Sequence, residues 1–503
     1  MKGSDMTVTQ LNPGQDPTDA KDRVIEHRRL LIGGVWAEPH STGLISVFSA
    51  NTEALIGSVP DPDAVDIDAA VRAARAAFDD PTGWSNWEPA ARAAGMRRLA
   101  DEIDKRSAEI ARWVSGQNGV PISVTAASEA VLPGQLLRLY ADLISERPGE
   151  EIRESSAGGR TLLRRLPVGV VAGIVPWNVP NILGALQYAP ALAAGCTVVL
   201  KPPAETPLDA ILVGEAILEA DLPAGVLNIV PGGRDAGAHL VAHPEVDRVS
   251  FTGSTATGRQ IGEVCGRLLR PVTVEAGGKS AAIVLDDANL DLGSVGQALA
   301  PALFGMNGQL CSVTSRVLAP RSRYDEVVET IVELARSLTV GKSLLSTTHV
   351  GPLVSERQRS RVEGYIATGV EQGARLVFGG GRPPQQPAGW FVEPTVFADV
   401  DSSMTIAREE IFGPVVTVTP YTDDEDAIRL ANDSEYGLAG TVWTTDDDRG
   451  LAVARRLVTG SAGINHYTYD LNSPTTMIKA SGVGLKMGPE ALDSYWRYQS
   501  IYL

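Results

Sequence analysis

Between about residues 168 and 279, short apolar segments alternate with segments of helical spacing, and this alternation constrains the fold more than any other feature. Two unbroken apolar segments predict strands that are covered on both faces, 168–175 and 196–200, and the segments 226–230 and 248–251 continue the series. Three segments between them predict helices: 181–194, 208–220 and 257–268. Such units predict an α/β fold with a doubly wound parallel sheet, which binds ligands at the carboxyl ends of its strands.

The regions on either side of this stretch differ from each other. Before it, apolar residues at three-to-four spacing predict three helices: 65–78, 92–114 and 123–144. After residue 279 the alternation resumes and predicts a second α/β sheet. Its predicted strands are 281–285, 315–319, 373–378, 391–397, 415–420 and 440–443, and its predicted helices are 324–338, 355–372, 424–431 and 449–457.

Composition excludes several classes of partner. The 503 residues carry 61 acidic and 44 basic side chains, a net charge of −17, which argues against nucleic acid or an anionic membrane as a partner. No apolar run is long enough to span a bilayer, and the polar residues 1–23 predict a mobile tail. The three cysteines are too few for a disulfide framework and are not spaced as metal ligands, so we predict no metal site and a cytoplasmic location.

One of these cysteines stands at an element junction. Cys311 follows the sequence Phe-Gly-Met-Asn-Gly-Gln-Leu at 304–310, where an apolar helical run gives way to a β-prone segment. A thiol at such a junction can act as a nucleophile, and nearby backbone N–H groups can bind an oxyanion. Most free cysteines are instead small buried hydrophobes, so this segment alone leaves both interpretations open.

Three further segments bear on that choice. They are Pro-Trp-Asn at 176–178, Val-Glu-Ala-Gly-Gly-Lys at 274–279 and Glu-Glu-Ile-Phe-Gly-Pro-Val at 409–415. Together with Cys311, in this order and spacing, they resemble the aldehyde dehydrogenase superfamily over about residues 31–484. The resemblance implies an NAD(P)-dependent enzyme that oxidises an aldehyde to its acid through a thiohemiacetal and a thioester on Cys311. It also implies that Asn178 binds the oxyanion and that Glu275 is the general base for thioester hydrolysis.

The sequence contains no Gly-x-Gly-x-x-Gly fingerprint, but Phe-Thr-Gly-Ser-Thr-Ala-Thr-Gly at 251–258 runs from a strand into a helix. Such a segment offers free N–H groups to a phosphate, although an ordinary helix cap would look similar. The resemblance implies that Gly253 and Ser254 lie against the pyrophosphate of the cofactor. It implies further contacts from Lys201 to the adenosine ribose, from Glu410 to the nicotinamide ribose, and from Trp177 and Phe412 along the cofactor.

The preference between the two nicotinamide cofactors depends on the residues after Lys201. NAD-preferring relatives often place a glutamate three residues after this lysine, where it repels a 2′-phosphate. Here Ala204 occupies that position and Glu205 comes one residue later. We therefore predict NAD as the cofactor, with NADP possible.

The resemblance places the substrate tunnel along the helix that follows Asn178. The candidate tunnel residues are Val179, Ile182, Leu183, Leu186 and Leu310. None is charged, and a carboxylated aldehyde would leave its charge unpaired there, so we predict a preference for apolar aldehydes. The 474–479 segment departs from the family pattern, and its Lys479 could supply a cation to the pocket.

The resemblance also implies a domain division. The dinucleotide-binding domain would comprise 24–146 and 167–279, the catalytic domain 280–472, and a small β oligomerisation arm and C-terminal tail 147–166 and 473–503. A homodimer or homotetramer is implied. Two alternatives stay open: an acylating enzyme that passes the thioester to coenzyme A, against which Glu275 argues, and a non-catalytic protein on the same fold.

Overall fold

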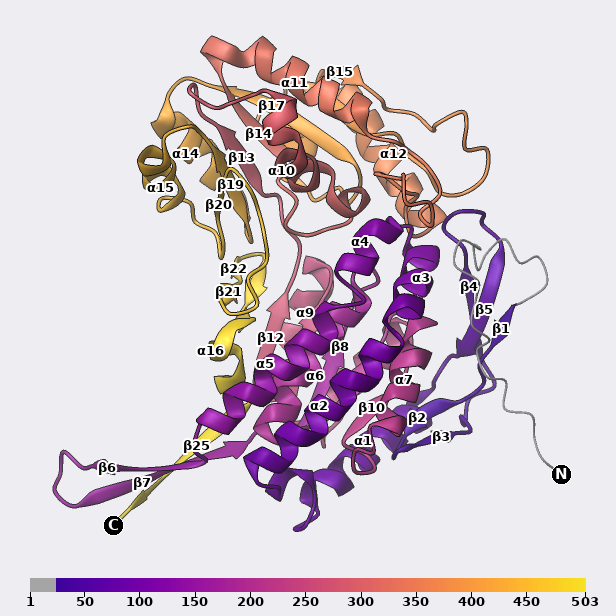
Figure 1. Cartoon of the computed structure of the whole chain (residues 1–503), viewed down its shortest axis with the longest axis vertical. Helices are drawn as coiled ribbons and strands as arrows, with labels where there is room; N and C mark the ends of the chain where they lie inside the picture. Colours follow the sequence, from indigo (N-terminus) through magenta and orange to yellow (C-terminus); the bar gives the residue numbers. More distant parts are fainter. Residues whose placement is uncertain (1–23) are drawn as a thin grey trace.

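Two large sheets, one of eight strands and one of seven, organise the chain (Figure 1). The computed structural model describes residues 24–503, so the tail predicted at 1–23 lies outside the described residues. Among residues 24–503, no helix combines the length and the apolar content that crossing a membrane requires.

The eight-stranded sheet has the order β23-β12-β11-β8-β9-β10-β2-β3. Its five parallel strands are β8 (Val170–Ile174), β9 (Thr197–Lys201), β10 (Leu227–Ile229), β11 (Arg248–Thr252) and β12 (Val272–Glu275). Its antiparallel edges are β2 (Leu30–Ile32), β3 (Val35–Ala37) and β23 (Gly482–Val483). The chain runs outward from β8 in both directions, so the predicted doubly wound parallel sheet is confirmed.

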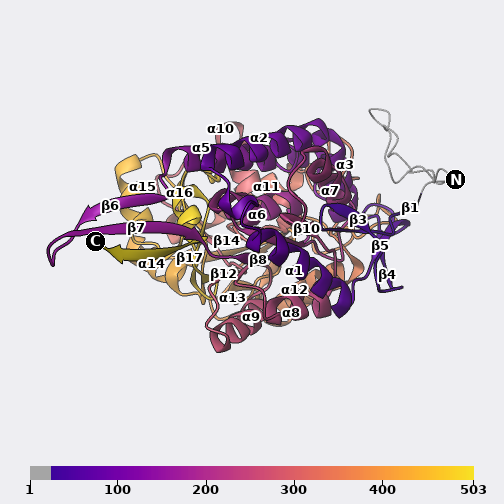
Figure 2. The ribbon, with the colours of Figure 1, turned by 90° about the horizontal axis from the view of Figure 1, so that it is seen from below.

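Helices cover both faces of this sheet, as Figure 2 shows. One face packs against α2 (Pro89–Lys105), α5 (Leu132–Glu146), α6 (Pro180–Ala194) and α7 (Asp209–Glu219). The other packs against α1 (Ala64–Asp79), α8 (Arg234–Ala242) and α9 (Thr255–Arg267). Helix α8 was not predicted, because its nine residues include a glycine and only a short apolar pattern.

Two helices that the sequence predicted as continuous are each divided. The segment 92–114 belongs to α2 and α3 (Ser107–Asn118), which are separated by Arg106 at φ −103° and ψ 0°. The segment 123–144 belongs to α4 (Ile122–Ala127) and α5. Pro133 lies in the first turn of α5, a position that needs no backbone N–H, whereas inside one long helix it would have broken the hydrogen-bond ladder.

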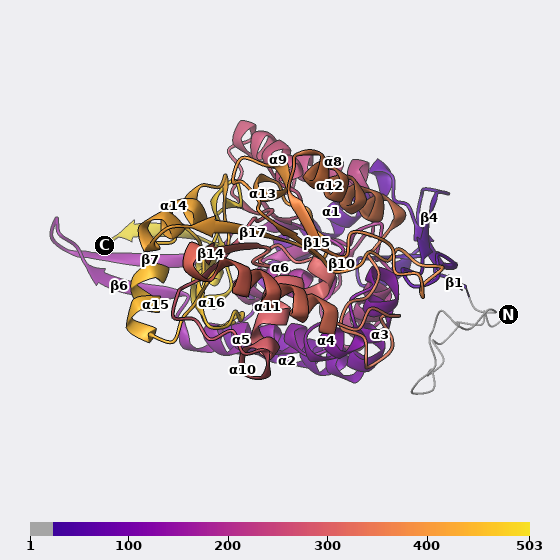
Figure 3. The same cartoon turned by 90° about the horizontal axis from the view of Figure 1, so that it is seen from above.

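The seven-stranded sheet has the order β15-β16-β17-β14-β13-β19-β20. Its strands are β13 (Ala281–Val284), β14 (Arg316–Pro320), β15 (Arg375–Phe378), β16 (Thr395–Ala398), β17 (Val415–Tyr421), β19 (Gly440–Trp443) and β20 (Gly463–Ile464). The predicted strand 391–397 begins only at Thr395, since Pro394 has no N–H to donate to a ladder. Figure 3 shows helices on both sides of this sheet, among them α10 (Leu292–Phe304), α11 (Tyr324–Ser337), α12 (Glu356–Glu371), α14 (Asp424–Asn432) and α15 (Asp447–Ala454).

A third sheet projects from the body of the molecule (Figure 2). It consists of β6 (Glu150–Glu154), β7 (Arg160–Pro167) and β25 (Trp496–Tyr502), with β7 in the centre. The C-terminal strand thus pairs with β7 of its own chain, from Trp496 opposite Pro167 to Tyr502 opposite Thr161. Earlier in the 473–503 segment, β23 lies at the edge of the eight-stranded sheet. The domain boundaries given above stay a prediction.

Candidate active site

Cys311 lies in the loop between α10 and β14, at the junction that the sequence predicted. The loop starts with a tight turn, Gly305–Gly308, in which Met306 and Asn307 have φ of 51° and 62°. The Asn307 amide donates to the carbonyls of Gly119 at 2.8 Å and Pro352 at 2.9 Å, which ties the turn to two distant segments. This anchoring fixes the backbone just before the thiol, and the thiol itself is half-buried.

Asn178 is brought to this loop by the carboxyl end of β8. Its Nδ2 donates to the Gln309 carbonyl at 2.9 Å, and its own carbonyl accepts from Asn118 Nδ2 at 2.8 Å. Gln309 Nε2 donates in turn to the Asn118 carbonyl at 3.2 Å. The structure therefore holds the buried Asn178 side chain against the segment that carries Cys311.

Glu275 is the last residue of β12 and meets a cation that the sequence analysis did not identify. Lys486, in β24 (Leu485–Lys486), places Nζ 3.1 Å from Glu275 Oε2. Thr252, opposite Glu275 on β11, donates its hydroxyl to Oε2 at 3.3 Å and accepts a hydrogen bond from Lys486. Both charged side chains are buried, with 12% of Glu275 and 5% of Lys486 exposed.

These charges act on the thiol. Burial raises the pKa of Cys311 well above its ordinary value, and the carboxylates of Glu275 and Glu410 add to this effect. The Lys486 ammonium lowers the pKa of the same thiol. Burial therefore favours the neutral thiol, and attack on a substrate requires that the thiol lose its proton.

Two tyrosines that the sequence analysis missed also face this group. The hydroxyl of Tyr469 donates to Ser312 Oγ at 2.6 Å, and the rings of Tyr467 and Tyr469 meet edge to face with centroids 5.5 Å apart. Burial raises the pKa of the Tyr469 hydroxyl well above its ordinary value, and the charge of Cys311 adds to it. The Tyr-x-Tyr spacing was readable in the sequence, but nothing in it indicated that both rings lie beside the thiol.

The predicted tunnel residues gather in the apolar core beside α6. Val179, Leu183 and Leu186 are buried in one cluster, and Ile182 packs against it together with Met306 and Leu471. Leu310 is half-buried, directly before Cys311. Lys479 does not join them, because its ammonium donates to the carbonyls of Asn432 at 2.8 Å and Ser434 at 3.0 Å.

The predicted pyrophosphate segment lies between β11 and α9. The Ser254 side chain is exposed and accepts from Thr257 N at 3.2 Å, so it caps a helix of 13 residues. Lys201 is buried at the end of β9, where Nζ donates to the carbonyls of Gly232 at 2.6 Å and Pro202 at 3.1 Å. Burial lowers the pKa of Lys201 to about 8.

The segment that follows α13 (Thr405–Arg408) supplies the opposite wall. Glu410 Oε1 accepts from the backbone N–H of Gly278 at 3.0 Å, and burial raises the pKa of Glu410 to about 7. Phe412 meets Trp177 edge to face, with ring centroids 5.3 Å apart. Two aromatic residues that lie far apart in the sequence thus form one surface beside a half-buried carboxyl.

Comparison with known proteins places this geometry in a family. The model of the aldehyde dehydrogenase family matches residues 36–501. The chain belongs to the aldehyde dehydrogenase family. Geranial dehydrogenase of Castellaniella defragrans is 50% identical over 479 residues, which cover 95% of this chain and 99% of that protein. Phenylacetaldehyde dehydrogenase of Pseudomonas fluorescens is 38% identical, with 94% and 95% covered.

A solved structure of an aldehyde dehydrogenase from Mycobacterium tuberculosis in complex with NAD+ superimposes with a TM-score of 0.92. It is 44% identical and covers 95% of this chain and 99% of its own. These comparisons confirm the predicted family and the predicted α/β fold. They also confirm the prediction of an NAD(P)-dependent aldehyde dehydrogenase.

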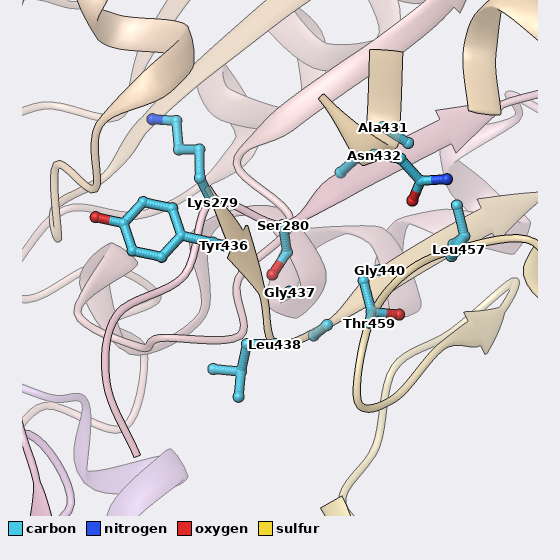
Figure 4. Close-up of a pocket in the computed structure, with 12 residues that line it drawn as sticks. Lys279, Ser280, Ala431, Asn432, Tyr436, Gly437, Leu438, Gly440, Leu457 and Thr459 are labelled. Carbon is cyan, nitrogen blue, oxygen red and sulfur yellow. The ribbon is translucent and has the colours of Figure 1, made fainter. Parts of the chain in front are cut away.

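A small cavity next to the Glu-x-Gly-Gly-Lys segment is lined by none of the predicted site residues. Figure 4 shows Lys279 and Tyr436 reaching to one side of it, away from Leu457 and Thr459. The cavity measures about 10 Å³, which is room for one water molecule and too little for an aldehyde. Burial lowers the pKa of Lys279 to about 7.

Proposed function

We propose that this protein oxidises apolar aldehydes to carboxylic acids with NAD+ as cofactor, using Cys311 as nucleophile, Asn178 as oxyanion donor and Glu275 as general base. The observation that carries the proposal is the convergence of these three residues. Asn178 bonds to the main chain two residues before Cys311, and the Glu275 carboxylate acts on the pKa of the thiol.

The first half of the reaction builds a covalent adduct. The thiol proton passes to solvent, and Cys311 Sγ forms a bond to the carbonyl carbon, whose oxygen becomes an oxyanion. Donors from the Asn178 amide and the Cys311 backbone N–H stabilise that oxyanion, each worth about 3 to 4 kcal/mol in comparable sites. When bound, the nicotinamide accepts the hydride that leaves the thiohemiacetal carbon.

The second half releases the acid. A thioester on Cys311 remains after hydride loss, and Glu275 removes a proton from a water molecule that attacks its carbonyl carbon. Collapse of the new adduct breaks the C–S bond, and the proton held by Glu275 passes to the sulfur and returns Cys311 to the thiol. The balance is one aldehyde, one NAD+ and one water consumed for one acid, one NADH and one proton.

The chemistry of the donor set fits a dinucleotide. The exposed Ser254 at the start of α9 would face the pyrophosphate, with Gly253 beside it. Lys201 has its remaining N–H for the adenosine ribose, and the Glu410 carboxyl can accept from the nicotinamide ribose. Trp177 and Phe412 offer their rings to the cofactor. Glu205 is engaged with Arg357 at 3.0 Å, so NADP stays open beside NAD.

The substrate class follows from the apolar residues that are proposed to line the substrate tunnel. Val179, Leu183 and Leu186 offer no cation to a carboxylated aldehyde, and Lys479 is bonded elsewhere. Each buried methylene of an apolar chain contributes about 0.8 kcal/mol. The names of the geranial and phenylacetaldehyde dehydrogenases, which are 50% and 38% identical, support the same class.

One assay separates the possible functions. NADH formation is followed with hexanal and with succinic semialdehyde, using NAD+ or NADP+, with and without coenzyme A. We expect kcat/KM for hexanal to exceed that for the semialdehyde by at least tenfold and the acid to form without coenzyme A. Faster turnover of the semialdehyde would overturn the proposed tunnel. Strict dependence on coenzyme A would indicate the acylating enzyme, and no NADH at all would indicate a non-catalytic protein.

We further propose a cytoplasmic homo-oligomer. Three free thiols suit a reducing compartment. The projecting sheet of β6, β7 and β25 exposes apolar side chains, including Ile152 and Tyr502, which suits a second copy of the chain better than water. Light scattering at several protein concentrations would measure the assembly size.

A further inference from the structure

Lys486 lies beside Glu275, the proposed general base, and the proposed reaction gives it no role. We propose that Lys486 is a positioning residue for Glu275: its buried ammonium holds the carboxylate at the nucleophile and keeps it ready to accept a proton during thioester hydrolysis. This inference rests on the proposed function, because it assigns the charge that supports the general base of that reaction.

Three strands build the contact. Glu275 ends β12, Thr252 ends β11, and Lys486 arrives from β24 because the preceding strand, β23, pairs with β12. In that pairing Gly482 lies opposite Glu275, and Ala276 donates to the Ser481 carbonyl at 2.8 Å. The lysine is therefore delivered by a ladder of main-chain hydrogen bonds and not by a loose loop.

The hydrogen bonds form a closed triangle. Lys486 Nζ lies 3.1 Å from Glu275 Oε2 and also donates to Thr252 Oγ1, and the Thr252 hydroxyl donates to the same Oε2 at 3.3 Å. Both contacts use Oε2, and Oε1 accepts none of the hydrogen bonds found among residues 24–503. One carboxylate oxygen is thus held while the other is left to meet a water molecule.

The surroundings make this ammonium important. Among residues 24–503, Glu275 is paired with Lys486, and its charge acts on three other ionisable groups. These are the Cys311 thiol and the hydroxyls of Tyr467 and Tyr469. In the described part of the chain, Lys486 is the one cation paired with Glu275. A buried carboxylate that loses its only cation becomes an uncompensated charge and tends to take up a proton.

The test is a set of charge variants at Lys486. Lys486→Met and Lys486→Gln remove the charge, and Lys486→Arg keeps it. Lys479→Met serves as the matched control, because Lys479 lies in the nearby β22 (Ile478–Lys479) and bonds two carbonyls outside the site. For each variant we would measure the NADH burst, the steady-state rate with hexanal, the pH–rate profile and the melting temperature.

We expect Lys486→Met to keep a burst near one NADH per active site while the steady-state rate at neutral pH falls roughly 10- to 100-fold, somewhat less than loss of the base itself. The acidic limb of the hydrolysis rate should move to higher pH, because the carboxylate form is no longer favoured by a cation. Lys486→Gln should behave alike, Lys486→Arg should restore most of the rate, and Lys479→Met should match the wild type.

Several results would overturn this role. An unchanged steady-state rate in both neutral variants would do so, as would an equal loss of burst and steady-state rate with the acidic limb unmoved. If Lys486→Met does not fold, Lys486→Gln carries the test, since its amide can still bond to Thr252. Failure of the proposed function is a separate result, because wild-type protein would then give no NADH with any aldehyde.

Discussion

The two walls of the site each present a glutamate to Cys311, and the two carboxyl groups have different partners. Glu275, from the eight-stranded sheet, is paired with the Lys486 ammonium. Glu410, from the wall opposite, accepts one backbone N–H, and burial raises its pKa to about 7. The difference teaches that one residue type can be fitted for proton abstraction or for binding according to the charge placed beside it.

The largest expected effect comes from removing the group on which both glutamates act. Cys311→Ala should lower turnover by at least about 10⁴-fold, because no covalent adduct can form. Cofactor binding should persist, and quenching of the protein's fluorescence would measure it. Turnover near the wild-type rate would show that Cys311 is not the nucleophile.

The next effect tests the wall that carries Glu275. Glu275→Gln should still give a burst of NADH and then stall at the thioester, with a steady-state rate about 10² to 10⁴-fold lower. Rapid-mixing absorbance and mass spectrometry of the trapped acyl-enzyme would measure both phases. Full steady-state turnover would assign the base elsewhere.

Glu410→Gln tests the opposite wall and should act on the cofactor instead. We expect the KM for NAD+ to rise roughly tenfold, the value of about one charge-assisted hydrogen bond. In the wild type that KM should also rise as the pH falls through about 7, because the carboxyl of Glu410 becomes protonated and accepts less well. The pH dependence should disappear in the variant. If Glu410→Gln instead gave a burst of NADH followed by a stall, Glu410 and Glu275 would not differ in function.

The smallest expected effect separates a hydrogen bond from a charge. Thr252→Val removes the hydroxyl that bridges Glu275 and Lys486 but leaves their ion pair. We expect a few-fold lower hydrolysis rate and a loss of about 1 kcal/mol in the free energy of unfolding, measured by denaturant titration. If Thr252→Val lowered the hydrolysis rate as much as Glu275→Gln does, the role assigned to Lys486 would belong to Thr252.

The sequence predicted the central strands well because their signal is local. The unbroken apolar segment at 168–175 contains β8, since a strand buried on both faces is mostly apolar along its length. Breaks inside helices were missed. The interruption at Arg106 follows from how α3 packs, and apolar spacing on either side of it looks continuous.

The candidate site was predictable only where a motif stood in one short segment. Cys311, Asn178 and Glu275 lie in such segments, and the structure brings them together. Lys486 and Tyr469 were missed because each meets its partner across a large part of the chain: Thr252 and Lys486 are 234 residues apart. A lysine in this segment carries no local sign of burial, so the sequence did not distinguish Lys486 from Lys479, which the structure places elsewhere.

The pairing of β23 with β12 has a consequence for the ribosome-bound chain. Glu275 is synthesised long before Lys486 leaves the ribosome, and β25, which closes the projecting sheet, emerges after both. A nascent chain would therefore expose a thiol and a carboxylate without the ammonium that balances them. The carboxylate that is proposed to drive thioester hydrolysis therefore gains its cation only after β23 has paired with β12.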